Sequence, residues 1–143
     1  MKVKKAFAAV ALGAAALFGA SVPAHAQISG DVIRIGVITD MSSVYADIDG
    51  QGGVEAIRMA IQDAGGNVAG KKIEVVSADH QNKPDVAATK AREWFDTQGL
   101  DVLIGGTNSG TNLAMAKVAA PMEMKGFFFS AATSALTNDQ CRV

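Results

Sequence analysis

The sequence predicts an α/β fold in which helices cover both faces of a parallel sheet. Three observations support this. Short apolar runs rich in β-branched residues alternate with amphipathic helical patterns, glycines or polar residues separate them, and no internal repeat follows the N-terminal leader. Right-handed crossovers between parallel strands place helices on both faces. Ligands of such sheets bind at the carboxyl ends of the strands.

The first 26 residues predict a secretory signal peptide, which is removed before folding. A positive start with three lysines precedes an apolar core over residues 6–20, and Ala24-His25-Ala26 supplies the small side chains of a cleavage site. A membrane anchor is the alternative, but it needs about 20 apolar residues, and glycines and Pro23 break this run. We therefore expect export, cleavage after Ala26 and one domain over residues 27–143.

The mature chain is expected to be mildly acidic. Without the three leader lysines, ten basic residues face 14 acidic ones, so the formal charge moves from −1 to −4. This balance argues against nucleic acid or an anionic membrane surface as the main partner. Cys141 is the single cysteine, so it either stays free or pairs outside this sequence.

Four strands are expected, over residues 32–38, 73–77, 102–104 and 126–130. The third is apolar throughout and is expected to be buried on both faces.

Three helices are expected between these strands. The first follows the glycines at 50–53 and ends near Gly65, the second runs from Pro84 towards Gly99, and the third ends near Ala120 because Pro121 follows. The side chains expected to face the core are Ile57, Ala60, Ile61, Ala64, Ala87, Ala91, Trp94, Phe95, Met115, Val118, Ala119 and Met122.

Four polar loops are expected to meet at the carboxyl ends of the strands, over residues 40–49, 79–82, 106–111 and 130–134; none contains lysine or arginine. In the third loop, Gly105 and Gly106 are expected to supply conformational freedom in φ, and hydroxyl and amide side chains precede a helix. Unpaired N–H groups at a helix start bind an anion, typically a carboxylate, without a basic side chain. Simple helix capping is the alternative.

A P-loop needs Lys and then Ser or Thr after its last glycine, but Gly110 is followed by Thr111 and Asn112. The loop also lacks the glycine spacing of a dinucleotide fingerprint and the glycines that flank the serine of a nucleophile elbow. An exported α/β hydrolase-like enzyme is nevertheless a second hypothesis, with Ser109, His80 and Asp79 as a triad on adjacent loops. Adjacent Asp and His are badly placed to orient each other, so we expect no enzyme. A metal site at His80 lacks ligand spacing. A receiver-like or flavodoxin-like signalling domain shares the alternating pattern, but export argues against it.

Four motifs occur in an order that carries a family resemblance. They are Ile-Gly-Val-Ile-Thr-Asp-Met-Ser at 35–42 followed by Tyr45, Gly-Gly-Val-Glu-Ala at 52–56, Gly-Lys-Lys-Ile-Glu-Val-Val at 70–76, and the loop at 106–111. In combination they resemble the leucine-binding type of periplasmic solute receptors, the substrate-binding proteins of ABC importers, whose two lobes close on a ligand.

The resemblance implies a type I lobe with flavodoxin-like strand order, a periplasmic location and no cofactor. It implies capture of branched-chain amino acids or aromatic carboxylates for a membrane permease. Ser109 and Thr111, together with Ala131 and Thr133, are implied to hold the ligand carboxylate and amino group, and Tyr45 to cover the ligand side chain.

Three departures from the family pattern qualify this expectation. Many relatives link the second and third loops by a disulfide, but Asn82 and Asn108 stand at the matching positions. Residues 45–50 and 79–82 look closer to a subgroup associated with aromatic carboxylates. Relatives also continue into a second lobe beyond the position of Val143, so residues 27–143 are expected to be a truncated N-terminal lobe, with a non-functional truncated receptor as an alternative.

Overall fold

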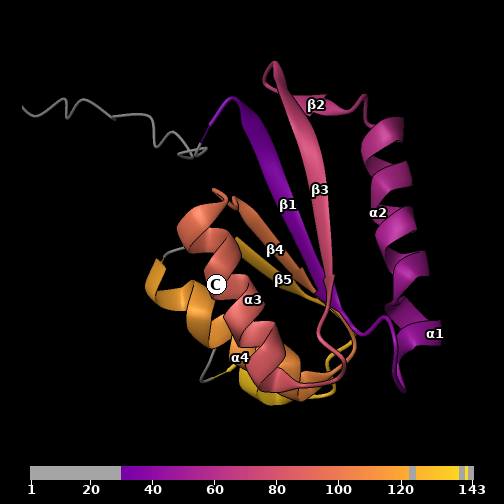
Figure 1. Cartoon of the computed structure of the whole chain (residues 1–143), viewed down its shortest axis with the longest axis vertical. Coiled ribbons are helices and arrows are strands. Elements are labelled where there is room, and N and C mark those ends of the chain that lie inside the picture. The colour runs from indigo at the N-terminus through magenta and orange to yellow at the C-terminus, as the bar shows by residue number, and fades with distance from the viewer. Residues whose placement is uncertain (1–29, 123–124, 139–140, 142–143) are drawn as a thin grey trace, which may run out of the picture.

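The computed structural model describes residues 30–122, 125–138 and 141 (Figure 1). The expected signal peptide and its cleavage site lie outside these residues. Within the described part of the chain, no helix combines the length and apolar character needed to cross a membrane. Cys141 is exposed and free.

Among the described residues, a five-stranded sheet forms the centre of the fold, in the order β2-β3-β1-β4-β5. β1 (Val32–Thr39), β3 (Lys71–Asp79), β4 (Val102–Gly105) and β5 (Lys125–Phe128) run parallel, as predicted. The last strand ends earlier than expected, and Ser130 takes a positive φ of 57° beyond it.

β2 (Asn67–Val68) pairs antiparallel with β3 and was not predicted. Two residues are too few to show a strand pattern, and the hairpin turn consists of Ala69 and Gly70, both at positive φ. Such a turn is usually marked by Asn-Gly or Asp-Gly, so its alanine hides it from sequence reading.

Helices cover both faces of the sheet, as predicted. α2 (Gln51–Asp63) lies on one face, whereas α3 (Pro84–Thr97) and α4 (Ser109–Ala119) pack side by side on the other (Figure 1). Two short 3₁₀ helices follow, η1 (Ala120–Met122) and η2 (Ser134–Leu136). The parallel sheet and its strand order establish the predicted α/β fold class.

The non-helical segment between the first strand and the first helix, which was expected to include the glycines at 50–53, is shorter than expected. A short helix, α1 (Ala46–Asp49), forms within it, and α2 begins at Gln51, so that Gly52 and Gly53 are helical. Glycine disfavours a helix by about 1 kcal/mol per residue, but packing of an apolar face overrides local propensity. Val54, which is fully buried, supplies that packing in the first turn of α2.

The core lies between the sheet and the pair α3 and α4. Trp94 with Ala87 and Ala91 from α3, and Met115 with Val118 and Ala119 from α4, are buried as predicted, and Phe95 packs against the core from a half-buried position. Met122 was expected in this stripe but is 37% exposed, because α4 ends at Ala119 and the Pro121 turn carries it away from the core.

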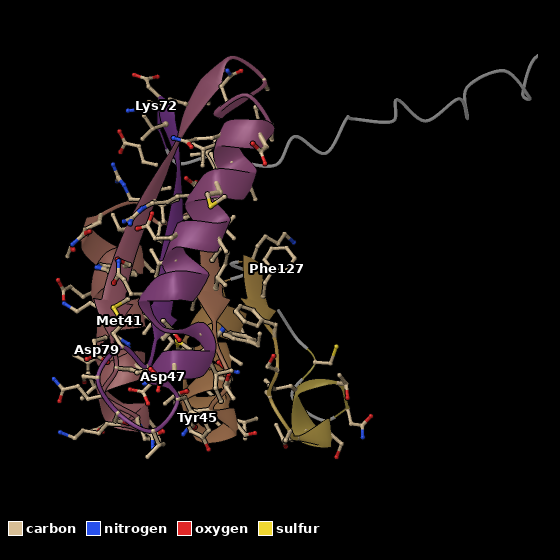
Figure 2. All side chains as sticks on the ribbon, turned by 90° about the vertical axis from the view of Figure 1, so that its right-hand side faces the viewer. Met41, Tyr45, Asp47, Lys72, Asp79 and Phe127 are labelled. Carbon is tan, nitrogen blue, oxygen red and sulfur yellow. The ribbon has the colours of Figure 1, made fainter. Side chains whose placement is uncertain are left out.

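The face under α2 is less completely covered. Ile57 and Ile61 are half-buried, and the predicted core positions Ala60 and Ala64 are exposed. In β4, Leu103 is fully buried, but Val102 and Ile104 are only half-buried, so the expectation of burial on both faces is wrong. Phe127, which pairs with Ile104, is 62% exposed (Figure 2).

Candidate functional site

The carboxyl ends of the parallel strands meet at one edge of the sheet, and we call the four loops there the rim: residues 40–49, 79–82, 106–111 and 130–134. Figure 2 shows Tyr45, Asp47 and Asp79 at this end of the molecule, with Lys72 at the opposite end. The rim is the edge at which the sequence predicts a ligand.

Asp40 organises the first rim loop. Its buried carboxylate accepts hydrogen bonds from the amide of Ser43 at 2.9 Å, the hydroxyl of Ser43 at 2.7 Å and the amide of Tyr45 at 3.0 Å. Burial by itself would raise the pKa of Asp40, but these hydrogen bonds outweigh it and lower the pKa. The backbone that carries the half-buried Tyr45 is therefore held by an ionised side chain.

Asp79 joins the second rim loop to the first. Its Oδ1 accepts the amide of Met41 at 2.9 Å and that of Gln81 at 2.7 Å. Burial opposes ionisation of Asp79, as does the charge of Asp40, but hydrogen bonds from Ser42, Met41 and Gln81 lower its pKa overall.

His80 is buried, and its ring is used within the second loop. Nδ1 accepts the amide N–H of Asn82 at 2.9 Å, so the neutral ring carries its proton on Nε2. Burial lowers the pKa of His80, although Asp40, Asp79 and Asp49 act in the opposite direction.

Asp40, Asp79 and His80 bring possible ligand atoms within 4.8 Å of one another. Both carboxylates already accept several hydrogen bonds, and in the tautomer that Asn82 selects, neither ring nitrogen of His80 offers a free lone pair. The same tautomer cannot take a proton from a serine. This cluster therefore fits a hydrogen-bonded turn better than a cation site or a catalytic base.

The second and third rim loops are linked by amide side chains. Asn108 donates from Nδ2 to Oδ1 of Asn82, so the two asparagines that were expected in place of a disulfide are in contact. Gln81 and Asn82 both adopt positive φ, at 52° and 56°. Two hydrogen bonds stabilise this unusual turn: one from the Asn82 amide to His80, and one from the Asn108 side chain to the Asn82 side chain.

Asn108 also caps α4. Its Oδ1 accepts the amide of Thr111 at 2.9 Å, and the hydroxyl of Thr111 donates to the Asn108 carbonyl at 2.9 Å. The capping prediction is thus correct for these two residues. The first amides of a helix have no partner within it, so the N–H groups of Ser109 and Gly110 remain directed out of the helix start.

The glycines of the third loop serve a different purpose from the one predicted. Neither Gly105 nor Gly106 has a positive φ. A Cβ at Gly105 would meet Asn112, Phe128 and Met115, and a Cβ at Gly106 would overlap Asp49 Oδ2 and lie 2.5 Å from Thr39 Oγ1. These positions require glycine because other side chains approach the backbone closely.

The five predicted ligand residues all lie on the rim. Tyr45, Ser109, Ala131 and Thr133 are half-buried, and the hydroxyl of Thr133 accepts the amide of Ala135 at 3.3 Å. Thr111 is fully buried beneath the loop. A further residue, Asp49, has no role in the sequence interpretation although it contacts the third loop; its partner is 58 residues away in the chain, and no local pattern marks the pair.

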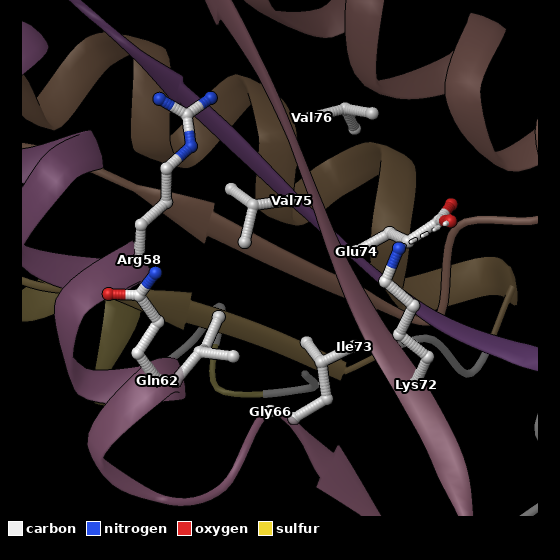
Figure 3. A pocket seen from close by; sticks show the side chains of 9 residues that line it. Arg58, Gln62, Gly66, Lys72, Ile73, Glu74, Val75 and Val76 are labelled. Carbon is white, nitrogen blue, oxygen red and sulfur yellow. Dashed lines mark ion pairs between the residues drawn. The ribbon is translucent and has the colours of Figure 1, made fainter.

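A separate groove of about 510 Å³ lies between α2 and β3 (Figure 3). Its charged side chains are neutralised by neighbours: Lys72 Nζ lies 3.8 Å from Glu74 Oε1, and Arg58 pairs with Glu55. The groove is away from the rim and contains none of the predicted ligand residues.

A family model described as periplasmic binding protein matches residues 32–142. The chain belongs to the periplasmic binding protein family. No curated protein sequence matches it.

Three solved structures show the same fold. A periplasmic binding protein from Burkholderia mallei is 61% identical, with a TM-score of 0.75, over 77% of this chain and 29% of that one. A branched chain amino acid ABC transporter periplasmic ligand-binding protein from Burkholderia xenovorans is 45% identical, with a TM-score of 0.69, over 73% and 28%. A solute binding protein of an ABC transporter from Rhodopseudomonas palustris, in complex with 3,4-dihydroxy benzoic acid, is 29% identical, with a TM-score of 0.72, over 79% and 31%.

These comparisons confirm the predicted resemblance to ABC transporter substrate-binding proteins of type I. This periplasmic binding protein spans about three tenths of the length of the structures that it matches.

Proposed function

We propose that residues 27–143 belong to the first lobe of an extracytoplasmic receptor that captures small carboxylates for an ABC importer. The supporting observation is the start of α4, where Asn108 and Thr111 are committed to capping while the amides of Ser109 and Gly110 point outward. The rim has no cationic side chain, so a carboxylate there would be held by backbone amides and hydroxyls.

The ligand class follows from the relatives. One is named for branched chain amino acids, and another holds an aromatic acid. We propose that Ser109, Ala131 and Thr133 contact the carboxylate and amino group and that Tyr45 covers the ligand side chain. Thr111 contributes by fixing the start of α4, since its side chain is buried. A membrane permease is the proposed protein partner, with export through the signal peptide and cleavage after Ala26.

We propose ligand binding rather than catalysis for this rim. The enzyme hypothesis needed His80 as a base for Ser109, but Nδ1 of His80 accepts the Asn82 amide and the ring is buried. Asp79 is bonded to two backbone amides.

Calorimetry on a two-lobed receptor that carries this chain as its first lobe tests the proposal, with isoleucine and 3,4-dihydroxybenzoate as probes. Ser109→Ala and Thr133→Ala should each weaken binding by about 1–3 kcal/mol, because a desolvated carboxylate loses a donor. Thr97→Ala, an exposed threonine at the end of α3, is the control and should bind like the parent protein. Unchanged affinity in both rim variants would show that these residues only support local structure.

A further inference from the structure

We propose that Asp49 is a positioning residue that sets the separation between the two parts of the ligand site, the Tyr45 loop and the start of α4. This inference rests on the proposed function, because it assigns a role to the same rim. It concerns a residue that does not itself contact the ligand.

Asp49 connects two rim loops that are distant in the chain. The residue is 5% exposed, and its Oδ2 accepts both the amide N–H of Thr107 and the Thr107 hydroxyl, the latter at 2.7 Å. Two donors from one residue fix the direction as well as the distance of the contact. A charged acceptor also makes stronger hydrogen bonds than a neutral one.

Each end of this connection is one step from a proposed ligand residue. On the α1 side, the amide of Asp49 donates to the carbonyl of Tyr45 at 3.3 Å, so a single helical turn joins the two. On the other side, Thr107 directly precedes Asn108, which caps α4 and is followed by Ser109. Tyr45 and Ser109 are therefore held at a distance that the Asp49 contact determines.

The backbone at Gly106 lies so close to the Asp49 carboxylate that a side chain at this position would block the contact with Thr107. A Cβ at Gly106 would overlap Asp49 Oδ2, so glycine is needed for the carboxylate to reach Thr107. Breaking the contact would leave a buried carboxylate and a backbone amide without partners, which is costly. α1 and the third loop consequently behave as one unit.

This arrangement has a consequence for specificity. If Ser109 holds the ligand carboxylate and Tyr45 covers the far end of the ligand, a fixed separation selects ligand length. Loosening the Asp49 contact should weaken binding and reduce the difference in affinity between a short aliphatic and a long aromatic carboxylate.

The test uses the same two-lobed receptor and measures dissociation constants for isoleucine and 3,4-dihydroxybenzoate by calorimetry, at a temperature where circular dichroism shows every variant folded. Asp49→Ala should weaken the better ligand roughly 5–30-fold. Thr107→Val removes only the hydroxyl donor, so it should weaken binding less than Asp49→Ala. Thr107→Ser keeps that donor and should bind with the affinity of the parent receptor. Asp47→Ala, an exposed acid on the same short helix (Figure 2), is the matched control and should stay within twofold.

In the double variant Asp49→Ala with Thr107→Val, the dissociation constant should rise by less than the product of the two single fold increases, because both substitutions remove the same contact. If Ser109→Ala weakens binding but Asp49→Ala and Thr107→Val bind like the parent with the same ligand preference, the positioning role is wrong and the proposed function stands. If the parent receptor binds neither probe, or Ser109→Ala and Thr133→Ala both leave affinity unchanged, the proposed function fails and this inference with it.

Discussion

The two faces of the sheet are covered very differently. Towards α3 and α4, Ile38, Leu103 and Met115 are at most 1% exposed, and they belong to one continuous core. Towards α2, Val54 is the buried residue of the helix, Ile57 and Ile61 are half-buried, and Phe127 is 62% exposed. The described part of the chain therefore draws its stability mainly from the α3 and α4 face.

β4 contains this difference within a single strand. Leu103 points to the covered face, and its neighbour Val102, which points the opposite way, is only half-buried. Since successive residues of a strand face opposite sides, the two positions differ in environment but not in strand or sheet position. Substitutions at such neighbouring positions measure the two faces separately.

The largest expected effect comes from Leu103→Ala, which should reduce the free energy of unfolding by about 2–5 kcal/mol through lost burial and the cavity left behind. Val102→Ala on the other face should cost less than about 1.5 kcal/mol. Urea denaturation followed by circular dichroism measures both. Equal losses would contradict the assignment of the core to the α3 and α4 face.

Two glycines provide a smaller contrast. A Cβ at Gly36 would lie 2.7 Å from the Trp94 ring and 2.8 Å from Leu100, so Gly36→Ala should destabilise the fold by about 1–3 kcal/mol. Gly52 in α2 has open space around it, and Gly52→Ala should stabilise the fold by about 0.5–1 kcal/mol through better helix propensity. The same denaturation experiment decides both; a stabilised Gly36→Ala variant would mean that the packed face has spare room.

The smallest effect concerns pH. Burial lowers the pKa of His80 below its usual 6.5, so below that pH the unfolded chain binds more protons than the folded one, and stability falls as the pH is lowered. His80→Asn keeps an acceptor for the Asn82 amide but does not titrate. The free energy of unfolding measured between about pH 5 and 6.5 should therefore depend less on pH in this variant. Asp40 and Asp79, with pKa values below 3.8, do not titrate there. An unchanged slope would exclude His80 as its source.

Several features of the fold could be read from local patterns. The stripe formed by Ala87, Ala91 and Trp94 predicts a helix and its buried side, because periodicity reports which side of an element is buried. The apolar run at 102–104 predicts a strand, although not which of its faces is covered. Pro121 predicts the end of α4 for an equally local reason, the missing N–H. Alternation of these elements was enough to predict a parallel sheet and the edge where its polar loops meet.

The contacts within that edge were not predictable in the same way. Nothing in the sequence around Gly106 indicates that the Asp49 carboxylate occupies the space where a Cβ would lie. The contact between Asn82 and Asn108 likewise joins residues 26 positions apart. The sequence by itself determined the order of the four parallel strands and the three long helices and the polar character of the rim, since these follow from neighbouring residues. Only the tertiary structure decided which rim side chains pair, at which glycines another side chain occupies the space of a Cβ, and which sheet face is covered. These features depend on contacts between segments that are far apart in the sequence.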